Sequence, residues 1–303
     1  MEFPLDSVLF NKLLEQEIST MCQLAIAEDL AVVDDHDIDS SNMNNDITAE
    51  LIEPDTQANA TLITRDSGVF CGQKWVNKIY ILLGNDVKLN WQISDGELMK
   101  PGQILCYLDG NARKLLTGER SAMNFTQILS ATATLTHQYV QKLDNPNCQL
   151  LDTRKTIPGM RFGQKYAVQC GGGINHRLGL ADAFLIKENH IIACGGIADA
   201  LTRAKQTHPN SLLEIEVENI EELQQAIEGE AQVIMLDNFN LDGLAEAVVI
   251  RDQSKSEAKL EASGNVNLET IANIGNTGVD FISAGALTKN IKAIDLSLRV
   301  GLS

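Results

Sequence analysis

The sequence is short of positive charge. It holds 24 lysine and arginine residues against 41 aspartate and glutamate residues, a formal net charge of −17, and its pI is about 4.6. A surface that is negative on average repels polyanions, so the composition excludes nucleic acid and anionic membranes as general partners. The hydrophobic fraction of 44% is ordinary for a globular protein and allows a sizeable core.

The sequence also lacks cysteine pairs and long apolar runs. Its six cysteines show no CxxC pair and no metal-finger spacing, so we expect reduced core residues rather than a disulfide framework. No apolar run is long enough to span a bilayer, and no basic-then-apolar signal opens the chain. We therefore expect a cytoplasmic protein.

One segment reverses the charge balance. Between residues 152 and 187, six cations stand against two carboxylates. The six are Arg154, Lys155, Arg161, Lys165, Arg177 and Lys187. A cationic segment in an acidic protein predicts a small, highly anionic substrate held inside a pocket, rather than a polymer bound at the surface.

Two periodicities divide the chain. Apolar residues recur at helical spacing over 8–30 and 118–140, whereas a period of two within 61–108 predicts a small antiparallel sheet. Over 146–283, short apolar runs alternate with helical stretches, which is typical of parallel βα units. The acidic, Asn-rich stretch 34–46 is predicted to be an exposed loop. We therefore expect an α/β barrel and a smaller companion domain.

Charged residues stand where the apolar runs of the second half stop. The run 148–152 is followed by Arg154 and Lys155, and the next three runs end in Lys187, Glu216 and Asp237. In a (β/α) barrel, the carboxyl ends of the strands line the active site. A charge there is costly to desolvate, so a ligand explains the recurrence better than stability does. The pattern predicts an enzyme, although the plainer alternative for the two cations is a solvated loop.

A glycine triplet precedes a second pair of candidate residues. Glycines 171–173 let the backbone turn sharply or approach a ligand, which is a weak signal on its own. The following His176 and Arg177 could cap a helix. Because they lead directly into a strand that ends in Lys187, we favour an aromatic substrate ring on His176 and a substrate carboxylate on Arg177.

The remaining motifs also have two interpretations each. Glu214, Glu216 and Glu218 fall on one face of a strand, which is either an exposed edge or an interior face that needs cations or a metal. The small-residue turns within 261–265 and 283–288 each lie between a strand and a helix. Such turns bind phosphate through backbone N–H groups, but they also occur merely as tight turns.

Taken together, these residues closely resemble the quinolinate phosphoribosyltransferase family, also called nicotinate-nucleotide pyrophosphorylase (carboxylating). The similarity covers nearly the whole chain, through the segments 27–30, 118–124 and 285–288, and it is densest over 152–191. It implies a reaction of NAD biosynthesis in which quinolinate and 5-phosphoribosyl-1-pyrophosphate, with Mg²⁺, give nicotinate mononucleotide, pyrophosphate and carbon dioxide.

The resemblance also implies a domain organisation and an assembly. We place an amino-terminal α+β sandwich-like domain at residues 1–128 and an open barrel of about seven parallel strands at residues 129–303. The last helix is expected to be able to pack back on the first domain. A homodimer or a hexamer of dimers is expected, in which Arg120 of one subunit reaches the quinolinate of its neighbour.

Roles for single residues follow from the same resemblance. Lys155, Glu216 and Asp237 are expected to be catalytic, and the two carboxylates are expected near the ribose hydroxyls and the Mg²⁺ that accompanies the diphosphate. Other substrate contacts are expected from residues that hold quinolinate, diphosphate or the 5-phosphate: Thr153, Arg154, His176, Arg177, Lys187, Ser263, Gly264, Asn265, Ser283, Ala284 and Gly285.

The sequence departs from the family pattern at two places, and two alternatives stay open. The segment 34–46 is longer than the expected compact turn, and Ser-Ala-Thr-Ala-Thr at 130–134 replaces Ser-Gly-Ile-Ala-Thr. One alternative is a paralogous phosphoribosyltransferase that acts on another carboxylated ring. The other is a carrier hairpin modified at Lys100, although the Pro-Gly that follows favours an ordinary turn.

Overall fold

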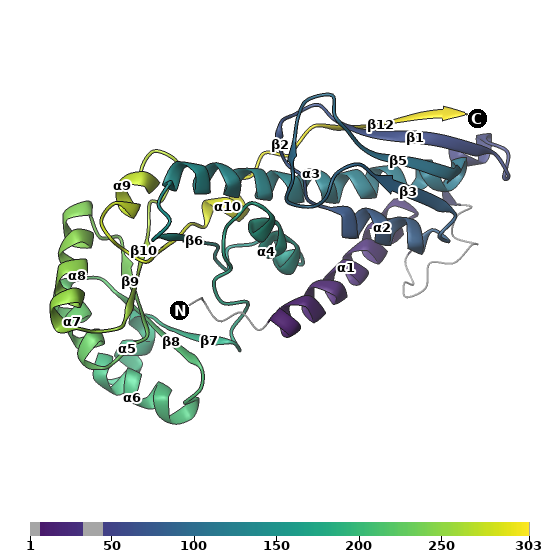
Figure 1. Cartoon of the computed structure of the whole chain (residues 1–303). Coiled ribbons are helices and arrows are strands. Elements are labelled where there is room, and N and C mark those ends of the chain that lie inside the picture. The colour runs from purple at the N-terminus through teal and green to yellow at the C-terminus, as the bar shows by residue number, and fades with distance from the viewer. Residues whose placement is uncertain (1–6, 33–44, 303) are drawn as a thin grey trace. The chain divides into compact units, whose positions relative to one another are not determined.

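The structure is a computed structural model that describes residues 7–32 and 45–302, and these form two compact units. The barrel unit comprises residues 137–156 and 173–289. The antiparallel unit comprises the described residues up to 136, together with 157–172 and 290–302 (Figure 1). Most of the predicted loop 34–46 lies outside the described residues, and the proposed boundary between residues 128 and 129 stays a prediction.

A parallel sheet forms the centre of the barrel unit, in the order β6-β11-β10-β9-β8-β7. Its strands are β6 (Gln149–Leu151), β7 (Ala183–Ile186), β8 (Leu212–Val217), β9 (Val233–Asp237), β10 (Lys259–Ser263) and β11 (Phe281–Ser283). An isolated parallel bridge between Leu151 and Ile174 continues the sheet beyond β6. The expected α/β class is confirmed, with six strands and this bridge in place of about seven strands.

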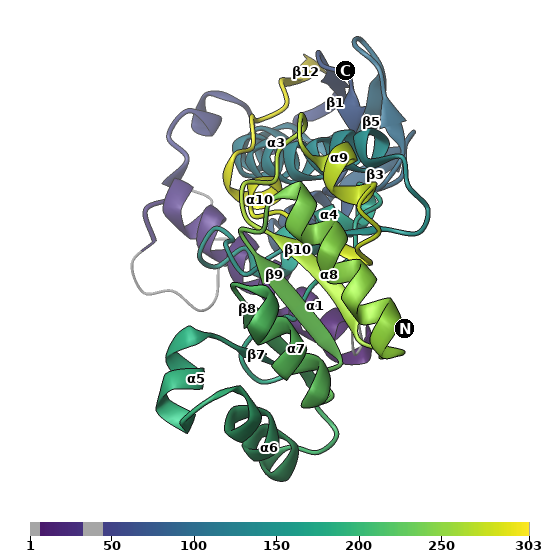
Figure 2. The ribbon, with the colours of Figure 1, turned by 90° about the vertical axis from the view of Figure 1, so that its left-hand side faces the viewer.

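Helices alternate with these strands, as the sequence predicts. They are α5 (Glu188–Cys194), α6 (Ile197–Thr207), α7 (Ile220–Glu228), α8 (Leu241–Ser254), α9 (Ile271–Gly275) and α10 (Ala286–Lys289). Asn219 and Asn240 begin α7 and α8, because their side chains accept backbone N–H groups of the first turn. Figure 2 shows α7 and α8 along one face of the sheet, in front of β9 and β10.

Apolar side chains fill the interior of the barrel unit. Leu151, Ala183, Leu212, Val233 and Phe281 form one cluster of buried residues. In β9, four of the five residues are buried, so both faces of the strand are covered. A strand buried on both faces carries a continuous apolar run rather than an alternating one, which is the pattern in the sequence.

The antiparallel unit is built on a four-stranded sheet of order β12-β1-β5-β3. Its strands are β1 (Gln57–Thr64), β3 (Val87–Trp91), β5 (Ile104–Asn111) and β12 (Leu296–Leu302), and β2 (Gly68–Val69) pairs separately with β4 (Leu98–Met99). Its helices are α1 (Ser7–Asp29), the 3₁₀ turn η2 (Ala49–Leu51), α2 (Gln73–Leu82), α4 (Arg161–Cys170) and most of α3 (Ala112–Leu143).

The end of the chain is divided between the two units, and the expected packing of the last helix on the first domain stays a prediction. The last helix, α10, belongs to the barrel unit, and the part of the chain that joins the antiparallel unit is the strand β12. Seven residues of β12 pair with β1, because the open edge of β1 offers unpaired backbone groups. None of the helices in the described part of the chain has the length and apolar character that a membrane span requires.

Candidate active site

The charges that follow the strands of the barrel unit lie at one edge of its sheet, because parallel strands end on the same side. Lys187, which follows β7, forms an ion pair with Glu216 of β8. Asp237 ends β9. Burial and the charge of Glu216 raise the pKa of Asp237, while Lys187 and Lys155 act in the opposite direction. Two carboxylates and two ammonium groups from four chain segments therefore act on one another.

Two guanidinium groups lie close together beside this group of charges. Burial and the positive charge of Arg154 lower the pKa of Arg177. One nitrogen of Arg177 donates to the carbonyl oxygen of Ala183, at 3.3 Å, across the open edge of β7. The Nε of Arg154 is buried and has no hydrogen-bond partner among the described residues. Two neighbouring cations, one with an unused donor, form a site that an anion would stabilise.

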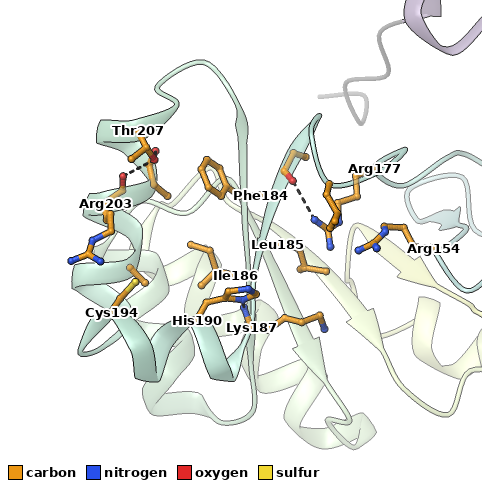
Figure 3. Close-up of a pocket in the computed structure, with 14 residues that line it drawn as sticks. Arg154, Arg177, Phe184, Leu185, Ile186, Lys187, His190, Cys194, Arg203 and Thr207 are labelled. Carbon is orange, nitrogen blue, oxygen red and sulfur yellow. Dashed lines mark hydrogen bonds between the residues drawn. The ribbon is translucent and has the colours of Figure 1, made fainter. Parts of the chain in front are cut away.

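A cavity of about 470 Å³ opens at these arginines. Figure 3 shows Arg154, Arg177 and Lys187 on one side of β7, and Phe184 on its other side, facing α6. The remaining lining comes mostly from apolar residues of β7, α5 and α6. A hollow with an apolar wall and a few converging cations suits a small organic anion.

His176 lies against two buried carboxylates in the barrel interior. Its Nε2 is 3.0 Å from Glu214 of β8 and 3.5 Å from Glu261 of β10. Burial alone would lower the pKa of His176, but the two carboxylates outweigh it and raise that pKa. Burial and Glu261 raise the pKa of Glu214 to about 7. Asp152 fixes the backbone here by accepting the N–H of His176 at 2.9 Å.

The two predicted phosphate turns follow β10 and β11. In the first, Gly264 has a φ of 99°, and a Cβ there would lie 2.2 Å from Asn238, so only glycine fits. In the second, a Cβ on Gly285 would lie 2.9 Å from Lys155, so this turn touches the loop after β6. The Ser283 hydroxyl is buried without a hydrogen-bond partner in the described part of the chain, as a ligand-binding group would be.

The structure does not bring every predicted residue together. Arg120 lies in α3 within the antiparallel unit, and its reach to quinolinate stays a prediction. Glu218 is exposed just beyond β8, so only Glu214 and Glu216 of the three glutamates lie in the strand. Lys100 lies at an ordinary turn after β4, with its N–H donated to Gln103.

Sequence reasoning missed one member of the buried cluster. Glu261 opens the segment 261–265 that contains the first predicted phosphate turn, but the sequence pattern assigns it no role. A signal was present, because Glu261 is the one acidic residue inside the otherwise apolar centre of β10, Leu-Glu-Ala. The sequence does not predict the contact between Glu261 and His176, since this contact depends on which strands face each other across the interior.

Two family models match this chain. The model of the N-terminal domain of quinolinate phosphoribosyl transferase matches residues 46–130, and that of its C-terminal domain matches residues 132–299. Together these matches cover well over half of the chain.

Relatives of known description agree with the family models. A probable nicotinate-nucleotide pyrophosphorylase (carboxylating) of Bacillus subtilis is 38% identical over 259 residues, which cover 85% of this chain and 89% of that protein. The nicotinate-nucleotide pyrophosphorylase (carboxylating) of Mycobacterium leprae is 36% identical, with 84% and 90% covered. The solved structure of the Francisella tularensis nicotinate-nucleotide pyrophosphorylase superposes with a TM-score of 0.87 at 45% identity, with 95% and 97% covered.

Proposed function

Because the chain belongs to the quinolinate phosphoribosyltransferase family, we propose that the strand-end rim of its barrel unit is where that family's reaction takes place. Its activity is the transfer of a phosphoribosyl group to quinolinate with loss of carbon dioxide, a step of NAD biosynthesis. The observation that carries the location is the pair of neighbouring guanidiniums of Arg154 and Arg177, which a dicarboxylate would neutralise.

Quinolinate would bind with its two carboxylates on Arg154 and Arg177 and its ring against His176. A guanidinium presents a planar fork of donors that matches a carboxylate, so two of them orient a planar dicarboxylate. The buried, unused Nε of Arg154 supports this placement, since a ligand oxygen would supply its missing partner.

Phosphoribosyl pyrophosphate would lie along the opposite part of the rim. Lys155 and Lys187 are the cations for its diphosphate, with Thr153 beside Lys155. The turns Ser263–Asn265 and Ser283–Gly285 would take its 5-phosphate, because exposed backbone N–H groups and a free hydroxyl are donors for phosphate oxygens.

The Mg²⁺ that this family's substrate implies fits the carboxylates of Glu216 and Asp237. Burial and repulsion by Glu216 raise the pKa of Asp237, and hard carboxylate oxygens are the ligands that Mg²⁺ prefers. When bound, the ion would neutralise charge on the departing diphosphate. Independently of the metal, the two carboxylates would stabilise the positive charge that develops on the ribose anomeric carbon.

The chemistry requires no protein nucleophile. The ring nitrogen of quinolinate forms a bond to the anomeric carbon as the bond to pyrophosphate breaks. The ring nitrogen is then cationic and accepts the electron pair of the adjacent carbon–carbon bond as carbon dioxide leaves, and a proton takes the vacated position. Positioning two polyanions with respect to each other therefore supplies much of the rate.

We further propose that Arg120 acts across the interface of a homodimer or hexamer of dimers, and that the protein works in the cytoplasm. Shared sites fit a homo-oligomer in which one unit of each subunit completes the site of its neighbour. The first of these proposals rests on the family resemblance.

Carbon dioxide release tests the proposed function directly. The purified protein is incubated with phosphoribosyl pyrophosphate, Mg²⁺ and quinolinate labelled in the carboxylate next to the ring nitrogen. We expect labelled carbon dioxide, nicotinate mononucleotide and pyrophosphate in equal amounts. Nicotinate, which has only one carboxylate, is the matched substrate control and should react poorly. Turnover of another carboxylated ring without turnover of quinolinate would contradict the proposal.

A further inference from the structure

A turn closed by one carboxylate connects the cation Arg177 to the beginning of β7. Both carboxylate oxygens of Asp182 accept backbone N–H groups of this turn, one from Leu178 at 2.5 Å and one from Gly179 at 2.8 Å. Local hydrogen bonds from backbone to side chain fix the path of a loop where no helix or strand does so. Residues 178–182 therefore form a turn whose shape depends on Asp182.

Arg177 is held at both ends of this turn. Its backbone directly precedes the turn, and its guanidinium returns to donate to the carbonyl oxygen of Ala183, the first residue of β7, at 3.3 Å (Figure 3). A change in the path of residues 178–182 would move these two attachment points relative to each other. The position of the guanidinium therefore depends on the turn.

The guanidinium of Arg177 needs such an attachment because a second cation lies nearby. Burial and the positive charge of Arg154 lower the pKa of Arg177, while Glu214 and Asp182 act in the opposite direction. Two neighbouring cations repel each other when no anion lies between them. Without the turn, Arg177 would move toward solvent, and binding of a substrate would then have to order its side chain again.

The plainer interpretation is that Asp182 closes a connecting turn and has no part in the site. Two observations favour a role in the site. Arg177, which precedes the turn, and Leu180, in its middle, both line the cavity of about 470 Å³. The negative charge of Asp182 also acts on Arg177. One short segment therefore supplies a cation and part of the apolar wall, and Asp182 fixes its path.

We propose that Asp182 is a positioning residue of the quinolinate site, which closes the turn 178–182 and so holds the guanidinium of Arg177 where a substrate carboxylate meets it. In this role Asp182 acts through Arg177 and not on the substrate, since its two oxygens accept backbone N–H groups. Because the turn is closed before the substrate binds, less ordering of Arg177 opposes binding. This inference rests on the proposed function, because it needs quinolinate on Arg177.

Two substitutions remove the hydrogen bonds of the turn in steps. Asp182→Asn keeps one acceptor oxygen and a similar volume, whereas Asp182→Ala keeps neither acceptor. We expect the KM for quinolinate at saturating phosphoribosyl pyrophosphate to rise about threefold in Asp182→Asn and about tenfold in Asp182→Ala. The KM for phosphoribosyl pyrophosphate should stay within about twofold. Asp242→Ala is the matched control, since Asp242 is an exposed carboxylate of the same unit, and it should leave both KM values unchanged.

A double-mutant cycle with Arg177 separates positioning from a general disturbance of the fold. Asp182→Ala should lower kcat/KM for quinolinate about tenfold in the wild type but less than about twofold in Arg177→Ala, because the group that Asp182 positions is already absent there. A purely structural role predicts the same factor in both backgrounds. Should Asp182→Ala fail to fold, the same cycle is run with Asp182→Asn, for which the expected factor in the wild type is about three.

Three results would overturn the inference. They are equal factors in the two backgrounds, an unchanged KM for quinolinate in both Asp182 variants, and equal rises in the KM values of the two substrates. An active wild type combined with any of them defeats the inference alone. A wild type that releases no carbon dioxide from quinolinate defeats the proposed function first, and the inference with it.

Discussion

At the scale of single residues, Lys155 has a backbone fixed by hydrogen bonds and an ammonium group that forms no ion pair within the described residues. The N–H of Lys155 donates to the hydroxyl of Thr153 at 3.1 Å, and its carbonyl oxygen accepts the hydroxyl of Thr288 at 2.8 Å. Its ammonium forms no ion pair within the described residues, whereas Lys187 is already paired with Glu216. Lys155 therefore has a defined position and a charge available for an anionic substrate.

Replacing Lys155 tests this assignment. We expect Lys155→Ala to lower the turnover number by about 10²- to 10³-fold, because a charge aimed at the departing diphosphate is lost. The circular dichroism spectrum should not change. Lys205→Ala is the matched control, since Lys205 is an exposed cation of the same unit that pairs with Glu230 at 2.8 Å, and it should keep full activity. Full activity of purified Lys155→Ala would refute the catalytic role of Lys155.

At the scale of elements, one aspartate holds the end of the barrel unit opposite to the active site. Asp280 precedes β11 and accepts Arg251 of α8 at 2.7 Å, Lys259 of β10 at 2.6 Å and the Leu260 N–H at 2.9 Å. Burial alone would raise the pKa of Asp280, but these hydrogen bonds and charges outweigh it and lower that pKa. A helix and two strands are therefore joined through one carboxylate.

Asp280→Asn should lower the free energy of unfolding by about 1–3 kcal/mol at pH 7, because charge-assisted hydrogen bonds are lost. A carboxyl whose folded pKa is depressed stabilises the protein above its unfolded pKa, so this contribution disappears as the pH falls below about 4. Denaturant titrations from pH 3 to pH 7 should show the two proteins converging at low pH. Asp252→Asn is the control. Asp252 also contacts Arg251, but its side chain is 63% exposed, so this substitution should lower the free energy of unfolding only slightly. A constant difference at all pH values would contradict the role of the charge.

At the scale of the whole molecule, the chain divides its predicted site residues between two units. Arg120 belongs to the antiparallel unit, and the other predicted contacts belong to the barrel unit. If Arg120 serves the site of a neighbouring subunit, as we propose, each active site needs two chains. Two inactive variants can then restore activity only when one oligomer contains a subunit of each.

Mixing Arg120→Ala with Lys155→Ala provides that test. Each variant alone should be nearly inactive, because each removes a cation from every site. After subunits are exchanged at equal concentrations, random pairing should restore about a quarter of the sites, since hybrid dimers hold one site with both defects and one with none. Steady-state carbon dioxide release measures the recovery. No recovery, despite hybrid dimers seen by native mass spectrometry, would place Arg120 and Lys155 of the same chain in one site.

The sequence by itself determined the local features of this protein. The alternation of apolar runs and helices predicted the βα units, because the two periods of side-chain direction are intrinsic to strands and helices. The charges after the runs predicted the rim, because parallel strands carry their carboxyl ends to one edge. Lys155, Lys187, Glu216 and Asp237 were predicted as site residues on that ground.

Only the tertiary structure decided the contacts that join distant segments. Strand β12 pairs with β1 although the two lie at opposite ends of the chain, and no local period specifies that partner. Likewise, His176 meets Glu214 and Glu261 because β8 and β10 turn these side chains toward one interior. Periodicity fixes which face of a strand is buried, but the order and closure of the sheet fix which side chains meet there, since that depends on packing over the whole unit.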